Sequence, residues 1–302
     1  MIDFQPIVPE NRERYAPYLE LVSHRGCGFS FANLSLWGHQ WASIVDGFLV
    51  IFSHYTGHTM YPFPAGTGDV KPVLDRIIAD SKKRGIPCRI SGVTAHEKEI
   101  LEEYYPGQWR YHCDRDNFDY VYDINDLAEL KGKKYQPKRN HVNRFLTDHP
   151  DSYILPLDEV TMADCRAFTD RWFARRQEED PDTDYFIEQR ALGKAYDHYR
   201  ELNMEGLVLY ADGKLVAMTM GSFLSEDMVD VHFEKADSDY ATAYAVINRA
   251  FARYLRDKYP QLKYLDREED MGSPGLRKAK LSYQPHHLVE KCWAHYAGEE
   301  YK

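Results

Sequence analysis

The chain has 302 residues, of which 43% are hydrophobic and 14% aromatic, which is enough apolar side chain to build a core and excludes an intrinsically disordered protein. This length exceeds that of a usual single core and predicts about two domains, which we place at residues 1–150 and 151–302. The formal net charge of −10 excludes nucleic-acid binding over the whole surface but permits one local basic patch.

The N-terminus and the cysteines indicate the environment of the chain. The first fifteen residues, MIDFQPIVPENRERY, contain no apolar run behind a basic segment, and no stretch reaches the roughly 18 apolar residues of a membrane span. We therefore expect a cytoplasmic protein without an integral membrane segment. The cysteines are odd in number and far apart, which predicts reduced thiols rather than a disulfide framework or a zinc site. They are Cys27, Cys88, Cys113, Cys165 and Cys292.

In the first half, strand and helix patterns alternate. After a helix start near residues 33–41, runs of β-branched and aromatic residues predict strands, and apolar residues at helical spacing predict helices. The expected strands are 48–55, 59–66, 87–93 and 119–124, and the expected helices are 70–84 and 95–105.

The second half has a fuller pattern. Two helices, 158–178 and 185–204, precede a hairpin that turns at Asp212-Gly213, a strong signal for a two-residue turn. The remaining predicted elements are a strand at 228–237, an amphipathic helix at 240–258, a strand at 263–270, a short helix at 275–281 and a closing strand at 286–296. This order is that of an acetyltransferase-like domain, in which central strands separate and make room for a donor. The first half has a less complete version of the same order and is interpreted as a degenerate copy.

Three stretches carry a more specific resemblance. They are FSFANLSLWG (29–38), the run at 231–255 and YLDREEDMGSPGLRKAKLSYQP (264–285). Together they resemble an uncharacterised bacterial family related to the C-terminal domain of phosphatidylglycerol lysyltransferases, which is itself similar to the aminoacyl transferases that form peptidoglycan bridges. The resemblance implies an α/β fold with two mixed sheets in tandem acyl-CoA N-acyltransferase (GNAT)-like domains. It also implies a small molecule, a phospholipid or an aminoacyl-tRNA as donor or acceptor.

The lysyltransferase motifs map onto this chain unevenly. Their D-x-x-R pair falls on His232 and Lys235, which changes the chemistry of both positions. Their terminal lysine segment matches better, because Lys280 stands five residues before Pro285 and Tyr283 takes the aromatic place. The resemblance thus implies that Lys280 is the cation that meets a developing oxyanion or a phosphate. We expect an alanine at this position to abolish transfer and, as for an exposed lysine, to leave stability almost unchanged.

The start of the helix at 240–258 bears on the donor. Coenzyme A-dependent relatives hold the pyrophosphate there with a glycine-rich loop and helix N-terminal amides. This chain reads KADSDYATAY, with no glycine and with Asp237 and Asp239 where phosphates would approach. We therefore expect coenzyme A to bind poorly and assign no cofactor. Capping of the helix by Ser238 or Asp239 explains the same residues equally well.

Two strands carry candidate acid and base groups. Asp230, His232 and Glu234 alternate on one face of the first strand, so that His232 or Glu234 could serve as the base. Asp266 and Glu268 share a face of the next strand and could lie beside them. Solvated polar residues and structural salt bridges to Arg267, Arg277 or Lys278 remain the alternative. The acids form only a loose set of hard ligands, so no metal is predicted.

The segment KGKKYQPKRNHVNRF (131–145) is strongly basic and contains no acid. Such density in an acidic protein favours a phosphate contact, such as an RNA acceptor end, a lipid head group or a nucleotide. A solvated basic helix or linker is the alternative. The predicted substrate-binding residues are Lys138, Arg139 and Arg144 from this segment, with Lys235 and Tyr283.

The function hypothesis combines these sites. It is transfer of an activated aminoacyl or acyl group to an amine or hydroxyl in a cleft between two GNAT-like domains, with His232, Glu234, Lys280, Asp266 and Glu268 as catalytic candidates. Two alternatives stay open. One is an unusual coenzyme A-dependent N-acetyltransferase, and the other is a non-catalytic binding module on a degenerate transferase fold.

Overall fold

A computed structural model of the protein describes residues 1–55 and 57–298, which divide into two compact units. Unit 1 contains residues 1–119, 269–274 and 288 onward, and unit 2 contains residues 120–268 and 275–287. The division differs from the predicted one at 150/151, because the segment after residue 119 supplies a strand and two helices to the second sheet rather than to the first. The final segment contributes one strand to each sheet.

Unit 1 is built on a seven-stranded mixed sheet of order β1-β2-β3-β4-β5-β14-β6. Its parallel pair is β4–β5, and β14, from the end of the chain, inserts antiparallel between β5 and β6. The strands are β1 Gln5–Pro6, β2 His39–Val45, β3 Phe48–Tyr55, β4 His58–Pro62, β5 Arg89–Val93, β6 Trp109–His112 and β14 Cys292–Tyr296. The helices are α1 Arg12–Glu20, α2 Phe31–Leu36, α3 Lys71–Arg84 and α4 Ala95–Tyr104.

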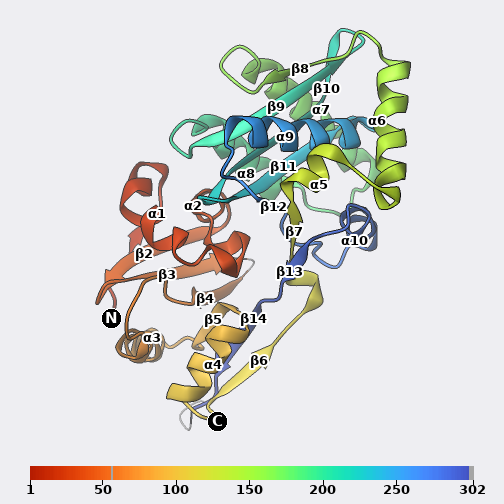
Figure 1. Ribbon diagram of the computed structural model, residues 1–302. Coiled ribbons are helices and arrows are strands. Elements are labelled where there is room, and N and C mark those ends of the chain that lie inside the picture. The colour runs from red at the N-terminus through yellow and green to blue at the C-terminus, as the bar shows by residue number, and fades with distance from the viewer. Residues whose placement is uncertain (56, 299–302) are drawn as a thin grey trace. The chain divides into compact units, whose positions relative to one another are not determined.

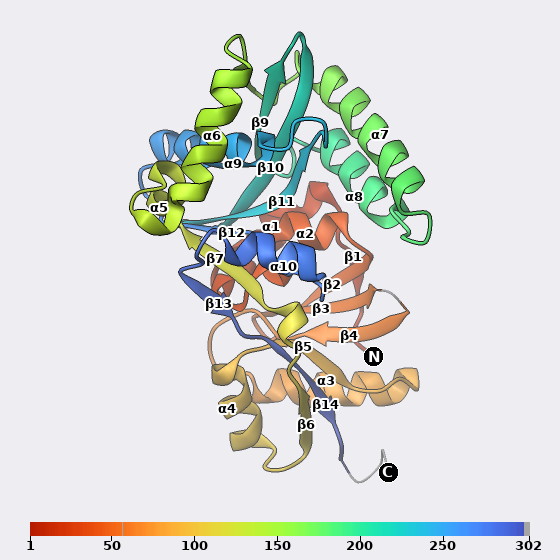
Figure 2. The ribbon, with the colours of Figure 1, turned by 90° about the vertical axis from the view of Figure 1, so that its right-hand side faces the viewer.

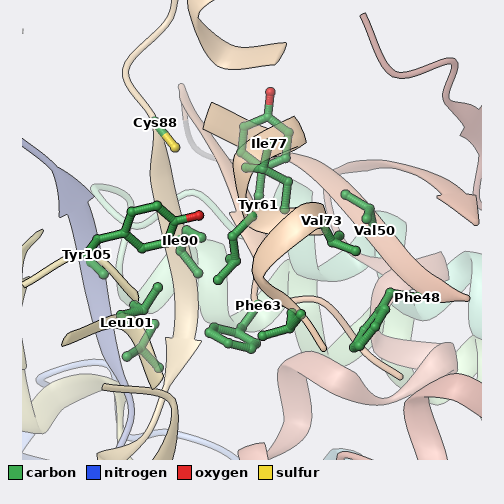
Figure 3. Packing of buried hydrophobic residues seen from close by; sticks show 14 of the residues in the cluster. Phe48, Val50, Tyr61, Phe63, Val73, Ile77, Cys88, Ile90, Leu101 and Tyr105 are labelled. Carbon is green, nitrogen blue, oxygen red and sulfur yellow. The ribbon is translucent and has the colours of Figure 1, made fainter. Parts of the chain in front are cut away.

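The core of unit 1 forms where α3 packs against the sheet (Figure 3). Val73 and Ile77 lie on the buried face of α3, and Tyr61 and Ile90 come from the parallel strands β4 and β5. The Tyr61 hydroxyl donates to Asp80 Oδ2 at 2.8 Å, so this buried carboxylate has a partner. Helical spacing of apolar residues had predicted this helix, and the contacts confirm it.

Cys113 and Cys292 form a disulfide in unit 1. The prediction that all five cysteines are reduced is therefore wrong for this pair. The two residues are 179 positions apart in the sequence, but β14 pairs with β6 in the register Trp293↔His112, which makes the cysteines neighbours. Sequence spacing could not reveal this, because the pairing depends on the return of the last strand. Cys27, Cys88 and Cys165 are buried and form no disulfide.

Unit 2 contains the second seven-stranded mixed sheet, of order β13-β7-β12-β11-β10-β9-β8. Its strands are β7 Asp119–Asp123, β8 Tyr153–Pro156, β9 Met204–Ala211, β10 Lys214–Ser225, β11 Met228–Ala236, β12 Tyr264–Asp266 and β13 His287–Val289. Its helices are α5 Ile124–Glu129, α6 Gln136–Asp148, α7 Met162–Glu179, α8 Phe186–Asp197, α9 Ala243–Lys258 and α10 Pro274–Leu281. The two mixed sheets confirm the predicted α/β class. The closing strand expected at 286–296 is two strands, β13 and β14, which belong to different sheets.

Helices cover both faces of the central strands of unit 2. α9 crosses β9, β10 and β11 on one face, with α5 and α6 packed against it, and α7 lies against β10 and β11 on the other (Figures 1 and 2). The buried face of α9 carries Val246, Ile247, Phe251 and Leu255, as its helical period predicts. The hairpin between β9 and β10 turns at Asp212-Gly213, as predicted; both have positive φ, 51° and 75°. No helix in the described part of the chain has the length and apolar content needed to cross a bilayer.

The parallel pairing of β11 with β12 is short, and the candidate site lies where β11 extends beyond it. Only three residues of β11 pair with β12, in the register Met228↔Tyr264, Val229↔Leu265 and Asp230↔Asp266. β11 continues to Ala236, whereas β12 ends at Asp266. The second half of β11 therefore has no ladder partner on its β12 side, and polar side chains there meet helices and turns instead.

Candidate active site beyond the end of strand β12

Glu234 lies on the part of β11 that extends beyond β12, and two side chains hold its carboxylate. Arg267 Nη2 donates to its Oε1 at 2.8 Å, and Asn248 Nδ2, from α9, donates to its Oε2 at 3.2 Å. Both side chains of the ion pair are largely buried, with 13% and 10% exposed for Arg267 and Glu234. A carboxylate fixed in this way is a defined acceptor for a proton or for an amine.

Arg267 owes its position to the turn after β12. Asp266 Oδ1 accepts from the amide of Glu268 at 2.8 Å, and Glu268 has φ 56°, so the chain leaves the strand direction at once. The Arg267 amide donates to the carbonyl of Tyr120 at 2.9 Å. The Arg267 guanidinium lies 4.9 Å from the ring centroid of Tyr283.

Two polar atoms beside this ion pair are buried and make no hydrogen bond within the described residues. They are Arg267 Nη1, a donor, and Asn248 Oδ1, an acceptor. Burying such groups is unfavourable unless a partner is supplied, and in binding sites the ligand supplies it. The geometry therefore suits a ligand that presents an acceptor to Arg267 and a donor to Asn248, as an amine-bearing ester or amide does.

Lys138, from α6, adds a second cation to the site. Its Nζ lies 3.9 Å from the centroid of the Tyr283 ring. Burial lowers the pKa of Lys138 to about 8, and the positive charge of Arg267 acts in the same direction, whereas Glu234 opposes it. Burial also raises the pKa of Tyr283, which keeps the ring a neutral phenol. Lys138 and Tyr283, both predicted to bind substrate, thus lie together next to the Glu234–Arg267 pair.

Lys280 lies beneath this pair rather than at the surface. It is 7% exposed, and its Nζ donates to the carbonyl of Arg267. The hydroxyl of Tyr122 donates to the carbonyl of Lys280 at 2.8 Å. The expectation that Lys280 behaves as an exposed lysine is wrong, because α10 turns it inward onto the turn after β12. It can position Arg267 directly.

His232 is fully buried in unit 2, and the groups around both of its ring nitrogens are defined. Nε2 lies 2.8 Å from Ser222 Oγ, and Nδ1 lies 3.3 Å from Glu268 Oε1 and 3.4 Å from Asp230 Oδ2. The structure thus brings Glu268 to His232, as the strand pattern suggested. Glu234, although on the same face of β11, contacts Arg267 and Asn248 instead. The Glu234 side chain is 10% exposed, whereas that of His232 is fully buried.

The other predicted substrate-binding residues lie elsewhere in unit 2. Lys235 points away from Glu234, as strand alternation requires; it pairs with Glu188 and lies 4.1 Å from the ring centroid of Trp172. Arg139 donates to the carbonyls of Leu130 and Gly132 and closes the loop before α6.

The remaining predicted contact, Arg144, is 75% exposed and pairs with Asp148 at 3.4 Å. Of the three basic-segment residues predicted to bind substrate, only Lys138 lies at the Glu234–Arg267 pair.

The acids before α9 are engaged with a neighbouring cation. Arg175 contacts Asp239 at 3.0 Å and Asp237 at 3.4 Å, and the Asp239 amide donates to Asp237 Oδ1 at 3.0 Å. The helix itself begins at Ala243, after Thr242. The acids therefore build the turn that precedes the helix, and neither caps it. Part of their negative charge is balanced by Arg175.

Sequence reasoning missed two of the central residues. Arg267 was considered only as a salt-bridge partner of nearby acids, and Asn248 was not considered. Asn248 carried a usable sequence signal, because it is a polar residue among the apolar positions of α9. The structure buries it to 3% exposure. No sequence signal indicated the position of Arg267, since that position depends on the turn at Glu268.

Comparisons with known proteins agree with this architecture. Residues 19–295 match the model of the phosphatidylglycerol lysyltransferase C-terminal family. The chain belongs to this family. A structure of a conserved protein of unknown function from Bacteroides thetaiotaomicron is 36% identical, with a TM-score of 0.93 over 98% of this chain and 100% of the other. The C-terminal domain assigned to a lysylphosphatidylglycerol synthetase from Agrobacterium fabrum has a TM-score of 0.70 at 14% identity, over 96% of this chain and 92% of the other.

The fold comparison extends to tandem transferases. A tandem GNAT protein from the clavulanic acid biosynthesis pathway superposes with a TM-score of 0.51 at 9% identity, over 99% of each chain, and at this identity the likeness concerns the fold alone. Together with the two mixed sheets, it confirms the tandem GNAT-like architecture. An uncharacterised protein of Mycoplasmoides gallisepticum is 25% identical over 175 residues, which cover 57% of this chain and about half, 54%, of that relative. Family and fold together support a general transferase role.

Proposed function

We propose that this protein transfers an aminoacyl or other acyl group from an activated ester to an amine or hydroxyl acceptor, at the site around Glu234 in unit 2. The observation that carries the proposal is the grouping of one carboxylate with two cations. Glu234 lies 2.8 Å from Arg267, and Lys138 lies over the ring of Tyr283, which Arg267 also contacts. Acyl transfer needs both a proton acceptor and positive charge at the oxygen on which charge develops.

The roles follow from these positions. The acceptor nitrogen or oxygen attacks the carbonyl carbon and forms the new bond, and its proton passes to Glu234. The bond between the carbonyl carbon and the ester oxygen then breaks, and the proton passes from Glu234 to the departing oxygen. Arg267 Nη1 and Lys138 Nζ are available to the carbonyl oxygen as it becomes negative. Lys280 acts as a positioning residue through the Arg267 carbonyl.

The substrate class follows from the same groups and from the family. Phosphatidylglycerol lysyltransferases, by their name, join lysine to a phospholipid, and an activated aminoacyl ester such as an aminoacyl-tRNA is the donor this chemistry requires. An aminoacyl ester presents a carbonyl to the cations and an ammonium or amine to Asn248 Oδ1 and Glu234. A simple acyl group lacks that amine, so we propose an aminoacyl donor over an acyl one.

A donor–acceptor screen tests the proposal. Purified protein is incubated with a mixture of radiolabelled aminoacyl-tRNAs and, in separate arms, phosphatidylglycerol vesicles, free amino acids and short peptides, and transfer is measured. We expect one acceptor class to become labelled, and Glu234→Gln to lower the rate about 10²–10⁴-fold, as for loss of a general base. The matched control is Glu159→Gln, because Glu159 is 77% exposed and lies on the surface.

Two results would count against this function. Transfer by Glu234→Gln at the rate of the unchanged protein would remove the site assignment. Ligand-induced thermal stabilisation without transfer in any arm would favour the binding module instead.

A further inference from the structure

Tyr244 lies at the start of α9, on the same side of the helix as Asn248. The two residues are four positions apart, which places them one above the other on successive turns. Asn248 donates to Glu234 at 3.2 Å, so this side of α9 faces the candidate site. Tyr244 is 39% exposed, whereas Asn248 is 3% exposed. A bound molecule therefore has access to the tyrosine.

The spacings of α9 and β11 match, and they bring Tyr244 to Ala236. Four residues of a helix advance about 6 Å, and two residues of a strand advance about 6.6–6.8 Å. Because Asn248 meets Glu234, the preceding turn of the helix meets the next residue on the same face of the strand. The Ala236 amide donates toward the Tyr244 hydroxyl, in agreement with this match.

The backbone of Ala236 shows independently which edge of β11 this is. Its carbonyl accepts from Trp172 Nε1 at 3.0 Å, while the next amide, that of Asp237, donates to the carbonyl of Val216 on β10 at 2.8 Å. The N–H and C=O of one strand residue point to the same side, so the Ala236 amide points away from β10. That is the side of β11 on which β12 pairs and ends. Tyr244 therefore lies at the edge of β11 that carries the candidate site.

The Tyr244 hydroxyl keeps its hydrogen. Burial raises the pKa of Tyr244, and the Ala236 amide acts against it. The carboxylates of Glu234 and Glu188 raise this pKa further, whereas the charge of Arg176 lowers it. A phenol that accepts from an amide still has its one O–H to donate, and this hydroxyl donates no hydrogen bond within the described part of the chain. Tyr244 is thus an uncharged donor at neutral pH.

The groups around Glu234 fall on the two oxygens of its carboxylate. Arg267 contacts Oε1 at 2.8 Å, and Asn248, with Tyr244 one turn before it, contacts Oε2. In acyl transfer two different oxygens gain negative charge, the carbonyl oxygen during attack and the ester oxygen during departure. The guanidinium serves the first of these oxygens in the proposed function. The phenol, on the other side of the carboxylate, suits the second.

We infer that Tyr244 donates a hydrogen bond to the departing ester oxygen of the donor substrate, where it stabilises the charge that builds before the proton from Glu234 arrives. The inference rests on the proposed function. Tyr244 forms no covalent bond and gives up no proton in this role, so the bonds and protons of the transfer remain as described. The substrate class that needs such a donor is an oxygen ester of an alcohol, such as the ribose ester of an aminoacyl-tRNA. A thioester needs it less, because a thiol is already acidic, with a pKa of about 8.5.

The dependence of the rate on the leaving group separates this role from a structural one. Transfer by the unchanged protein and by Tyr244→Phe is measured with two esters of one amino acid, the ribose ester of its aminoacyl-tRNA and a nitrophenyl ester, whose oxygen departs without help. With the ribose ester we expect Tyr244→Phe to lower kcat about 10²–10³-fold, as for loss of one preorganised donor, with little change in KM. With the nitrophenyl ester the two proteins should transfer at the same rate. If the protein does not use the nitrophenyl ester, the split between kcat and KM with the ribose ester decides.

The matched control is Tyr153→Phe, which removes the same hydroxyl elsewhere in unit 2. Tyr153 is 50% exposed and lies on β8, which β9 and β10 separate from β11. This variant should transfer from both esters at the rate of the unchanged protein, and chemical denaturation should show that both variants stay folded. A full rate of Tyr244→Phe with the ribose ester, or an equal loss with both esters, would overturn the inference and leave the proposed function standing. Absence of transfer by the unchanged protein would overturn both.

Discussion

Arg267 donates from Nη2 to Glu234 at 2.8 Å, while its Nη1 is buried with no hydrogen-bond partner within the described residues. One guanidinium thus fixes the proposed base and keeps a second donor for a ligand. Lysine cannot do both, because its ammonium is a single point of charge without the planar fork. Substitutions that keep the charge of Arg267, or that change Arg267 and Glu234 together, therefore test the two roles of Arg267 better than removal of either charge alone.

We expect Arg267→Lys to lower transfer about 10²–10³-fold, as for loss of one preorganised electrostatic contact. Arg267→Leu should in addition lower the free energy of unfolding by about 3–5 kcal/mol, since it leaves the buried Glu234 unpaired. The double change Arg267→Leu/Glu234→Gln should recover much of that stability but no activity. Chemical denaturation and rate measurements on the three variants separate the two roles. Equal stability of Arg267→Leu and the unchanged protein would contradict the buried ion pair.

Lys138 gives ligand binding and stability opposite dependences on pH. Its pKa is lowered from 10.5 to about 8, with burial as the largest cause. Between these values the unfolded chain holds a proton that the folded protein has released, so this residue makes stability rise with pH. Above pH 8 the ammonium is lost, so affinity for an anionic or carbonyl ligand should fall.

The matched variant is Lys138→Arg, because arginine stays charged throughout this range. Titration of ligand binding from pH 7 to pH 10 should show a decline centred near 8 in the unchanged protein and none in the variant. A decline of the same size in Lys138→Arg would assign the dependence to another group.

Lys280→Ala is expected to affect both activity and stability. Lys280 is buried and donates to the Arg267 carbonyl, which the substitution would leave without this donor. Loss of a buried hydrogen bond from a charged group costs about 1–3 kcal/mol, and displacement of Arg267 should lower transfer about 10²-fold or more. Lys278→Ala, on the exposed part of the same helix, is the control and should change neither. An active, fully stable Lys280→Ala protein would show that Lys280 has no positioning role.

Coenzyme A should bind weakly. The segment before α9 has no glycine and presents Asp237 and Asp239, which pair with Arg175 and, for Asp237, with Lys214 at 3.8 Å; Arg175 also pairs with Glu179. Calorimetry should give no binding in the low-micromolar range. Asp239→Asn should change this little, since the missing glycine-rich loop remains missing. Tight binding that persists in high salt would instead support a coenzyme A-dependent acetyltransferase.

The Cys113–Cys292 disulfide should stabilise unit 1 by tying β14 beside β6. A bond that closes a loop of this length contributes about 2–5 kcal/mol in chain-entropy terms. We expect the double variant Cys113→Ser/Cys292→Ser to have a denaturant midpoint that is lower by a corresponding amount. A reductant should lower the midpoint of the unchanged protein equally and should leave that of the double variant unchanged. Cys88→Ser is a control for thiol chemistry, because Cys88 is free and buried. No change on reduction would mean that the strand pairing alone holds β14.

The sequence by itself determined the elements and their class. Three features are local patterns: the helical periods of α3 and α9, the Asp212-Gly213 turn and the alternation along β11. Each follows from local backbone geometry, so the sequence alone was enough to predict it. The motifs at 29–38, 231–255 and 264–285 together predicted the family. The polar face of β11 was predicted from alternation, with His232 and Glu234 on it.

Only the tertiary structure decided which of these residues meet. Glu234 contacts Arg267 rather than His232 because β12 ends at Asp266 and the chain turns at Glu268, whose φ is 56°. Lys280 is buried because α10 directs it onto that turn, and Cys113 bonds to Cys292 because β14 returns to the first sheet. Each of these contacts joins segments distant in sequence. These long-range contacts form only when distant segments pack together in the folded chain, and no local pattern of residues encodes that packing.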